Sequence, residues 1–266
     1  YGNPSSMYTF GDQVGKKLKQ ARQRVADLIN ADPREIVFTS CGTESDNAAI
    51  HTALETSPEK KHIITTVVEH PAVLNLCKTL EKKKGYRITL VPVDKKGRLD
   101  LDLLYDAMSE DTAVISVMWA NNETGVIFPV KEIAKKASQK GILFHTDAVQ
   151  AAGKVPIDVK EAGVDMLSLS GHKIHAPKGV AVLYLKKEIT FSPFIIGGHQ
   201  EGGRRGGTEN TVSIIGLGKA CQLARENLDV MNSLVRELRD YLQDRLMEEI
   251  PSCSVNGDLD LRLPNT

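Results

Sequence analysis

The chain lacks the charge imbalance and the long apolar segments that characterise several classes of protein. Its 266 residues contain 34 Lys and Arg and 34 Asp and Glu, so the formal net charge is zero. A neutral chain creates no global field that would attract nucleic acid or an anionic membrane surface. No apolar run approaches the roughly 18 residues that suggest a membrane span. We therefore expect neither a nucleic-acid partner nor a membrane partner.

Cysteine is also scarce, and its spacing favours neither a metal site nor a disulfide framework. Cys41, Cys77, Cys221 and Cys253 are widely separated and form no CxxC pair. We therefore expect no bound metal and a reducing, cytoplasmic location. Each cysteine is expected to be a small buried hydrophobic residue. None of them is then a credible nucleophile.

The sequence has no internal repeat, no low-complexity segment, no initiator methionine and no signal-like start. We expect one large domain and part of another within a longer or incompletely ordered chain. The predicted division is an N-terminal arm at 1–12, a large cofactor-binding domain at 13–220 and the start of a small C-terminal domain at 221–266.

Short apolar runs alternate with segments of helical periodicity along most of the chain. Seven runs are expected to be strands: REIVFTSC (34–41), KHIITTVV (61–68), RITLVPV (87–93), TAVISVMWA (112–120), ILFHTDAV (142–149), VDMLSLS (164–170) and VAVLYLK (180–186). This alternation is typical of an α/β fold, with a mainly parallel sheet between layers of helices. From about Ala220 the pattern becomes a long helix followed by the strand-like SCSVNG (252–257), which indicates the smaller domain.

Polar residues lie where several of these runs end, and ligands of open α/β sheets bind beyond the carboxyl ends of the strands. In TSCGTES, Gly42 and Thr43 begin a helix whose free N–H groups could bind a phosphate. The alternative is an ordinary N-cap formed by Thr43 or Ser40. His70 ends another run and could stack on a planar ligand or move protons, although a lone histidine at a strand end more often has a hydrogen-bonded structural role.

Two more strand ends carry candidate residues. Asn121 and Asn122 follow TAVISVMWA and could bind a ligand hydroxyl or carboxylate, but Asn also suits a turn. Asp147 follows the apolar run of ILFHTDAV, and Gln150 lies about one helical turn further on. For Asp147 too, an N-cap is the simpler interpretation when it is considered alone.

Lys173 favours a ligand site over these structural interpretations, because it lies between two strand-like segments in SLSGHKIHAPKG. Most lysines are solvated surface charges. A lysine amine in a partly desolvated pocket is nucleophilic and can form a Schiff base with a carbonyl compound. Ser170 and His172 beside it could donate hydrogen bonds to a phosphate.

Together these residues match the needs of pyridoxal phosphate. Its aldehyde requires a lysine, its phosphate requires helix-terminal N–H groups and hydroxyls, and its ring nitrogen requires a carboxylate. Lys173 supplies the first, Thr43, Ser170 and His172 the second, and Asp147 the third. A dinucleotide site is disfavoured, since no GxGxxG follows the first strand.

Eight ordered blocks then show a resemblance to a known family. The chain resembles the NifS-type cysteine desulfurases, in the class V branch of the fold-type I pyridoxal-phosphate-dependent transferases. The blocks are GNPSS, TSCGTES, TTVVEHPAV, SVMWANNETG, HTDAVQAAGKVPID, SGHKIHAPKG, GGHQEGGRRGGTEN and LPNT. The fold implied is a seven-stranded-type, mainly parallel sheet between helices, with a smaller C-terminal domain that is truncated here.

The resemblance also implies a role for each matching residue. Lys173 would bind the cofactor covalently and Asp147 would pair with its ring nitrogen. His70 would stack on the ring and assist proton transfer, and Gln150 and Asn122 would contact the ring hydroxyl and the substrate. The residues implied to hold the phosphate are Gly42, Thr43, Ser170 and His172, with Thr208 reaching the phosphate of a neighbouring subunit. That last contact implies a homodimer with shared active sites, whereas GGHQEGGRRGG by itself indicates only a mobile loop.

The implied activity is that of a sulfurtransferase. L-cysteine would be converted to L-alanine, and the sulfur would pass as a protein persulfide to an iron-sulfur scaffold protein, including one that serves nitrogenase. The family's catalytic cysteine and its arginine for the substrate carboxylate would lie beyond Thr266. Residues 1–266 by themselves are thus expected to bind the cofactor without completing the reaction. The alternatives are another class V aminotransferase or lyase, and a non-catalytic sulfur-transfer scaffold.

Overall fold

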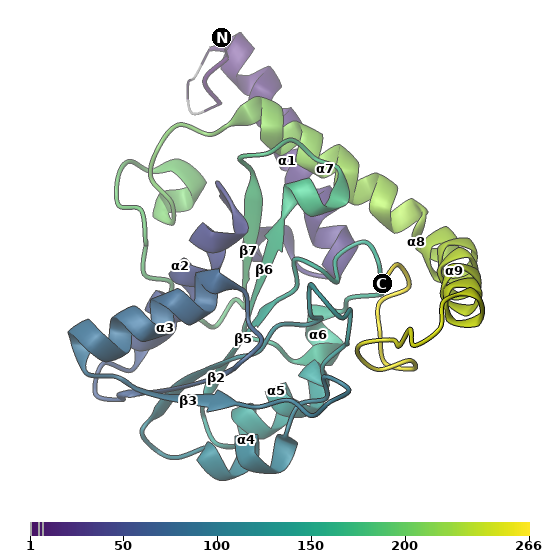
Figure 1. Ribbon diagram of the computed structural model, residues 1–266. Coiled ribbons are helices and arrows are strands. Elements are labelled where there is room, and N and C mark those ends of the chain that lie inside the picture. The colour runs from purple at the N-terminus through teal and green to yellow at the C-terminus, as the bar shows by residue number, and fades with distance from the viewer. Residues whose placement is uncertain (1, 5, 7) are drawn as a thin grey trace.

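The chain forms a seven-stranded sheet with helices on both faces (Figure 1). The computed structural model describes residues 2–4, 6 and 8–266. The strands are β1 (Ile36–Thr39), β2 (His62–Thr66), β3 (Arg87–Val91), β4 (Thr112–Ser116), β5 (Leu143–Asp147), β6 (Met166–Ser170) and β7 (Ala181–Leu185). Each of the seven predicted runs contains one of these strands, so the predicted α/β fold is confirmed.

Five of the described helices connect successive strands, one precedes β1 and three follow β7. The helices are α1 (Thr9–Ile29), α2 (Gly42–Thr56), α3 (Pro71–Lys84), α4 (Leu101–Ala107), α5 (Val130–Gln139), α6 (Val159–Ala162), α7 (Thr211–Glu226), α8 (Leu228–Val230) and α9 (Arg236–Glu249). Four further helical segments are the 3₁₀ turns η1 (Pro33–Glu35), η2 (Gly171–Ile174) and η3 (Gln200–Gly203) and the π-helical η4 (Met231–Val235). Helix α3 has a proline in its first turn and is capped at its C-terminus by Gly85, whose φ of 70° suits glycine.

The strand order is β1-β7-β6-β5-β4-β2-β3. Neighbours from β3 to β6 pair in parallel, and β7 is antiparallel to both β6 and β1. As a result β1 points in the same direction as the parallel strands. The segments that follow β1, β2, β4, β5 and β6 therefore all emerge at one edge of the sheet, where α/β proteins bind their ligands.

Alternate strand residues pack into two separate cores. Ile63 faces a core formed with α2 and α3, whereas its neighbour Ile64 faces a core formed with α1, α4, α5, α6 and α7. The two-residue period of a strand explains this division. Both faces are buried, which is why the strands read as continuous apolar runs instead of alternating ones.

Helices α1 and α7 lie side by side on the second face (Figure 1). A Cβ atom on Gly218 of α7 would lie 2.5 Å from the Cα atom of Ala21 in α1. Glycine is therefore required for this close approach of the two helices. This contact holds α7, the helix that leads toward the C-terminus, against α1.

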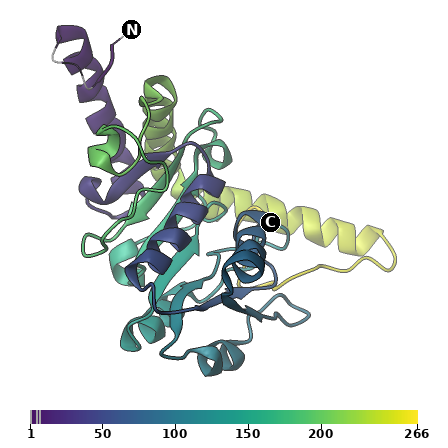
Figure 2. The same ribbon diagram turned by 90° about the vertical axis from the view of Figure 1, so that its left-hand side faces the viewer.

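The C-terminal part differs from the prediction in two ways. SCSVNG (252–257) forms no strand in the described structure, and the nearby regular pairing is one bridge between Arg262 and Val126. The helical run already begins at Thr211, before the predicted Ala220, and α9 projects from the body with no buried residue (Figure 2). Its apolar residues, such as Leu238 and Tyr241, are exposed, so packing does not enforce a strand beside it.

The predicted arm at 1–12 contains residues 1, 5 and 7, which lie outside the described residues, as does part of the GNPSS block. Helix α1 begins at Thr9, inside the predicted arm. In residues 2–4, 6 and 8–266, no helix is long and apolar enough to cross a membrane.

Candidate active site

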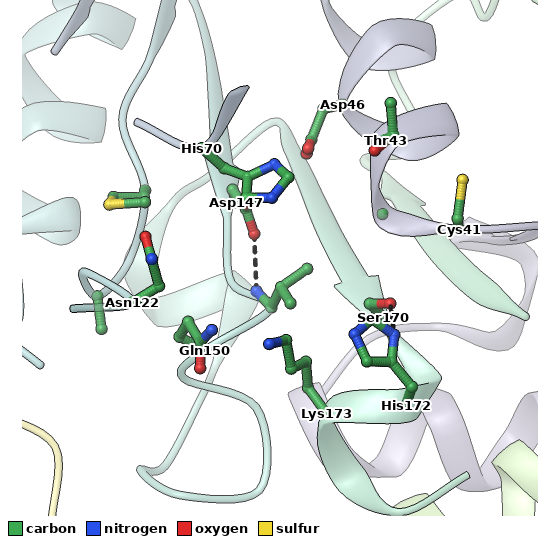
Figure 3. Close-up of a pocket in the computed structure, with 14 residues that line it drawn as sticks. Cys41, Thr43, Asp46, His70, Asn122, Asp147, Gln150, Ser170, His172 and Lys173 are labelled. Carbon is green, nitrogen blue, oxygen red and sulfur yellow. Dashed lines mark hydrogen bonds between the residues drawn. The ribbon is translucent and has the colours of Figure 1, made fainter. Parts of the chain in front are cut away.

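A pocket of about 250 Å³ opens at the edge of the sheet where the parallel strands end (Figure 3). Nine of the ten predicted site residues line it: Gly42, Thr43, His70, Asn122, Asp147, Gln150, Ser170, His172 and Lys173. They come from five different strand-to-helix segments. The parallel topology brings together residues that are up to about half the chain apart in sequence.

Helix α2 presents an uncapped N-terminus to this pocket. The N-cap residue is Cys41, and its side chain makes no capping hydrogen bond in the described structure. The alternative N-cap by Thr43 or Ser40 is thus wrong. Ser40 instead binds the Glu44 carboxylate through its hydroxyl and through its backbone N–H, at 2.8 Å for the latter. The first N–H groups of α2 are available for an anionic ligand.

Gly42 provides the space in front of this helix end. A Cβ atom on Gly42 would lie 3.3 Å from Val149 Cγ2 and 3.5 Å from Ser170 Cβ. The first contact is tight and the second is an ordinary van der Waals contact, so a side chain at position 42 would press against Val149. The glycine keeps a cradle open between α2, the β5 end and the β6 end.

His70 is held by its own helix. Its Nδ1 atom accepts a hydrogen bond from the Ala72 backbone N–H at 3.1 Å, which caps α3. Because Nδ1 is the acceptor, a neutral His70 carries its proton on Nε2. The structural role considered for His70 is therefore real, and it also orients the ring toward the pocket that His70 lines.

Asp147 is the buried carboxyl group at the end of β5, with 6% of its surface exposed. Its Oδ1 atom accepts a hydrogen bond from the Val149 backbone N–H at 2.8 Å (Figure 3). Burial raises the pKa of Asp147, while this hydrogen bond and the nearby His70 and Lys173 oppose the increase. A cation beside Asp147 would therefore be strongly favoured.

Lys173 lies on η2, directly after β6, and its side chain extends toward Asp147 and Gln150 (Figure 3). The expectation of a partly desolvated amine is wrong for this chain, because Lys173 is exposed. The reason is its position on a short surface turn above the sheet edge. Beside it, His172 Nδ1 and Ser170 Oγ are 2.9 Å apart, so these two phosphate candidates hold each other in place.

The two amide side chains occupy the opposite wall. Gln150 accepts a hydrogen bond at Oε1 from Lys154 Nζ, at 3.0 Å, which leaves its Nε2 donor for the pocket. Asn121 forms the turn that was the alternative interpretation, since its Oδ1 atom accepts from the N–H groups of Glu123 and Thr124. Asn122 lines the pocket instead.

Thr208 is the predicted residue that the structure places elsewhere. It is exposed and lines a separate pocket of about 160 Å³ with Gly179 and Glu209. The segment before it, predicted to be a mobile loop, is anchored by two ion pairs, from Arg22 to Glu201 at 2.6 Å and from Arg205 to Glu44 at 2.9 Å. Charged side chains within the glycine-rich run explain this difference.

Asp46 is a site residue that the sequence analysis missed, and Glu69 is a buried carboxyl group next to a site residue. Asp46 lines the pocket from α2, and Glu69 directly precedes the pocket residue His70 in the chain. Both are buried, and Asp46 Oδ1 and Glu69 Oε2 have no hydrogen-bond partner within the described residues. Asp46 follows Thr43 by three residues and so shares its helix face, which is the signal that could have identified it.

The four cysteines divide into two groups. Cys77 and Cys221 are buried as predicted, and burial raises the pKa of each thiol to about 12, which keeps both unreactive. Cys41 is exposed at the pocket and Cys253 is half-buried, so the expectation of burial is wrong for these two. Both lie in loops without a surrounding core. In the part of the chain that the structure describes, no group of three or more His, Cys, Asp or Glu residues could hold a metal ion.

These features are typical of one class of protein, which a comparison of the chain with known proteins identifies. The family model for aminotransferase class-V matches residues 1–266. The chain belongs to this family. Its enzymes depend on pyridoxal phosphate, in agreement with the cofactor predicted from the sequence.

Within the family the chain is similar to cysteine desulfurases. It is 57% identical over 267 residues to the cysteine desulfurase NifS of Azotobacter vinelandii, and this match covers 100% of the chain and 66% of that protein. The structure of a NifS-like protein superposes with a TM-score of 0.94 at 40% identity, covering 99% of this chain and 72% of the other. The structure of SspA in complex with cysteine has a TM-score of 0.79 at 40% identity, covering 84% and 65%. The predicted resemblance to NifS-type enzymes is confirmed.

The chemistry of the pocket fits pyridoxal phosphate. An uncapped helix end, a glycine cradle and the Ser170 hydroxyl form one pole, where an anion would be stabilised. A buried carboxyl group, Asp147, forms the other pole, and the Lys173 amine lies between them (Figure 3). This is the donor set that the phosphate, ring nitrogen and aldehyde of the cofactor require.

Proposed function

We propose that this protein is a pyridoxal-phosphate-dependent cysteine desulfurase that converts L-cysteine to L-alanine and transfers the sulfur as a protein-bound persulfide. The observation that carries the proposal is the placement of Lys173, Asp147 and the uncapped α2 N-terminus around one pocket. The similarity to cysteine desulfurases supports the choice of L-cysteine as substrate.

Each pole of the pocket has a distinct task in this proposal. Gly42, Thr43, Ser170 and His172 hold the phosphate together with the N–H groups of α2. Asp147 holds the protonated ring nitrogen, because its burial makes a neighbouring cation favourable. When bound, the cofactor supplies an electron sink for the bonds around the substrate α-carbon.

The remaining residues move protons and orient the substrate. His70 Nε2 carries the mobile proton, since Nδ1 is engaged by the Ala72 N–H. Lys173 Nζ supplies the amine that anchors the cofactor and can accept a proton once released. Gln150 Nε2 and the Asn122 amide contact the ring hydroxyl and the substrate from the opposite wall.

The proposal extends to the assembly and the cellular role. Thr208 is exposed and lies outside the main pocket, which supports a contact with the phosphate of a second subunit in a homodimer with shared sites. An iron-sulfur scaffold protein, including one for nitrogenase, is the proposed sulfur acceptor, and the proposed location is cytoplasmic. Residues 13–220 are the proposed large domain, and 221–266 the start of the small one.

The decisive experiment measures L-alanine formed from L-cysteine by the full-length protein with a thiol present. Lys173→Ala should reduce the rate by more than about a thousandfold, since it removes the anchoring amine. The matched control is Lys178→Ala, five residues further on, exposed and outside the pocket. Its rate should stay within about twofold of the wild type. Absence of alanine from a cofactor-loaded wild type would refute the proposal.

A further inference from the structure

Asp46 is a buried carboxyl group that the proposed chemistry does not use. It is the fifth residue of α2, is 1% exposed, and lines the pocket on the side of His70 and Asp147 (Figure 3). Its Oδ1 atom has no hydrogen-bond partner among residues 2–4, 6 and 8–266. A buried polar atom left without a partner costs free energy, so this arrangement needs an explanation.

The neighbouring histidine does not form an ion pair with Asp46. His145 Nε2 lies 3.7 Å from Asp46 Oδ1. However, both ring nitrogens of His145 contact hydroxyl groups at 2.9 Å, those of Ser116 and Ser168. Burial lowers the pKa of His145 to about 3, so the ring is neutral at physiological pH. Asp46 therefore has no positive charge from this side.

The other groups around Asp46 include two carboxyl groups, those of Asp147 and Glu69. The groups that face it are Asp147 and His145 from β5, Glu69 and His70 from the segment before α3, Ser168 from β6, and Cys41 from its own loop. Burial raises the pKa of Asp46 well above its usual value, the charge of Asp147 adds to this, and the Ser168 hydroxyl opposes it. Two neighbouring carboxyl groups without a fixed cation cannot both ionise.

The proton of this pair belongs on Asp46. Asp147 accepts a hydrogen bond from the Val149 N–H, and His70 and Lys173 both favour its charged form. Among the described residues, no cationic side chain contributes to the same extent at Asp46. The two carboxyl groups are thus in different environments, which separates their protonation states.

We propose that Asp46 remains a neutral carboxylic acid and acts as a positioning residue that leaves Asp147 as the single carboxylate facing the protonated ring nitrogen of the cofactor. This inference deepens the proposed function and rests on it for the identity of the ring. The protonation of Asp46 itself can be measured with or without the ring. A second carboxylate at this position would compete for the ring proton and add an unpaired buried charge.

Infrared spectroscopy of the full-length protein tests the proposal directly. Aspartate labelled with ¹³C at the side-chain carboxyl carbon shifts the carbonyl stretching band of any protonated aspartic acid and leaves that of Glu69 in place. At pH 7 the wild type should show such a shifted band, and Asp46→Asn should lose it. Asp147→Asn is the matched control and should retain the band, since desolvation of Asp46 remains.

In the infrared measurement, two results would overturn the inference: no label-sensitive band in the wild type, or a band that persists in Asp46→Asn. A second measurement follows the absorbance of the bound cofactor against pH. Asp46→Asn should leave the midpoint within about 0.3 pH unit, because it replaces one neutral group by another. A shift of more than about one pH unit would mean that a negative charge had been removed. The wild-type band decides the question even if Asp46→Asn fails to fold, and a protein that shows the band but binds no cofactor refutes only the proposed function.

Discussion

The titratable groups buried at the two ends of β2 differ in whether all of their polar atoms have hydrogen-bond partners. At the amino end, His62 is fully buried, and its two ring nitrogens contact the hydroxyls of Thr112 and Thr89 at 2.8 Å each. Just beyond the carboxyl end, Glu69 is also buried, and its Oε1 atom accepts hydrogen bonds from Met118 N–H and Thr66 Oγ1. Its Oε2 atom has no partner in the described part of the chain.

This difference separates a structural end of the sheet from a functional one. Satisfied buried groups rigidify a core, whereas unsatisfied ones lower stability and persist where a ligand or a reaction needs them. Asp46, with its unsatisfied Oδ1 atom, lines the pocket, and Glu69, with its unsatisfied Oε2 atom, directly precedes the pocket residue His70. The unpaired oxygens thus make the carboxyl edge of the sheet less stable than it would be with every buried polar atom hydrogen-bonded. This is the edge where the cofactor is proposed to bind.

The largest stability effect is expected from Glu69→Gln. Burial raises the pKa of Glu69 from 4.5 to about 8, so the folded protein keeps a proton that the unfolded chain releases. Wild-type stability should therefore fall as the pH rises from about 4.5 to about 8. The free energy of unfolding of Glu69→Gln should exceed that of the wild type by an amount that grows by about 1.4 kcal/mol per pH unit in this window.

Chemical denaturation of the cofactor-free full-length protein at several pH values measures this difference. Glu81→Gln, on the exposed side of α3, is the matched control and should show no such slope. If the difference between Glu69→Gln and wild type does not change with pH, Glu69 is already ionised in the folded state. In that case the environment of Glu69 stabilises its charged form, and the group buried at the carboxyl end of β2 is no less well stabilised than His62 at the amino end.

The opposite pH dependence is expected from His62→Leu. At pH 7 this change should destabilise the protein by about 2–3 kcal/mol, because the Thr112 and Thr89 hydroxyls lose their buried partner. Burial lowers the pKa of His62 from 6.5 to about 4, so the unfolded chain binds a proton first as the pH falls. The wild type should lose this stabilisation between pH 6.5 and about 4.

The measurement is the same denaturation series extended to acid pH, where the unfolding free energies of wild type and His62→Leu should converge. Alanine formation by the folded variant should remain within about twofold of the wild type, since His62 lies at the far end of the strand. A variant that is stable at pH 7 but loses cofactor would show that the two ends are not independent.

Much of the fold could be predicted because the strands are buried on both faces. The seven apolar runs, the Pro71 and Gly85 signals of α3 and the mainly parallel sheet all follow from local patterns. The antiparallel insertion of β7 between β1 and β6 could not be predicted, because pairing depends on contacts between distant segments. The strand expected at SCSVNG does not form, since an alternating pattern forms a strand only where a partner strand is available.

The site residues that could be predicted from the sequence are those that lie at the ends of strands. Asp147, Ser170 and the Gly42–Thr43 pair follow apolar runs and meet at one edge, as the parallel topology requires. Asp46 escaped detection because it lies inside α2, where an acidic residue suggests a solvated face. The anchoring of the glycine-rich segment by Glu201 and Arg205 was also unpredictable, since their partners are more than 150 residues away.

The most direct test of the central claim is the intact mass of the full-length protein before and after borohydride reduction, with peptide mapping. Reduction fixes the cofactor on the amine that holds it, so we predict a phosphopyridoxyl increment on the peptide containing Lys173, and its loss in Lys173→Ala. An increment on Lys154 or another lysine, or no increment on a folded protein supplied with pyridoxal phosphate, would contradict the assignment of this pocket.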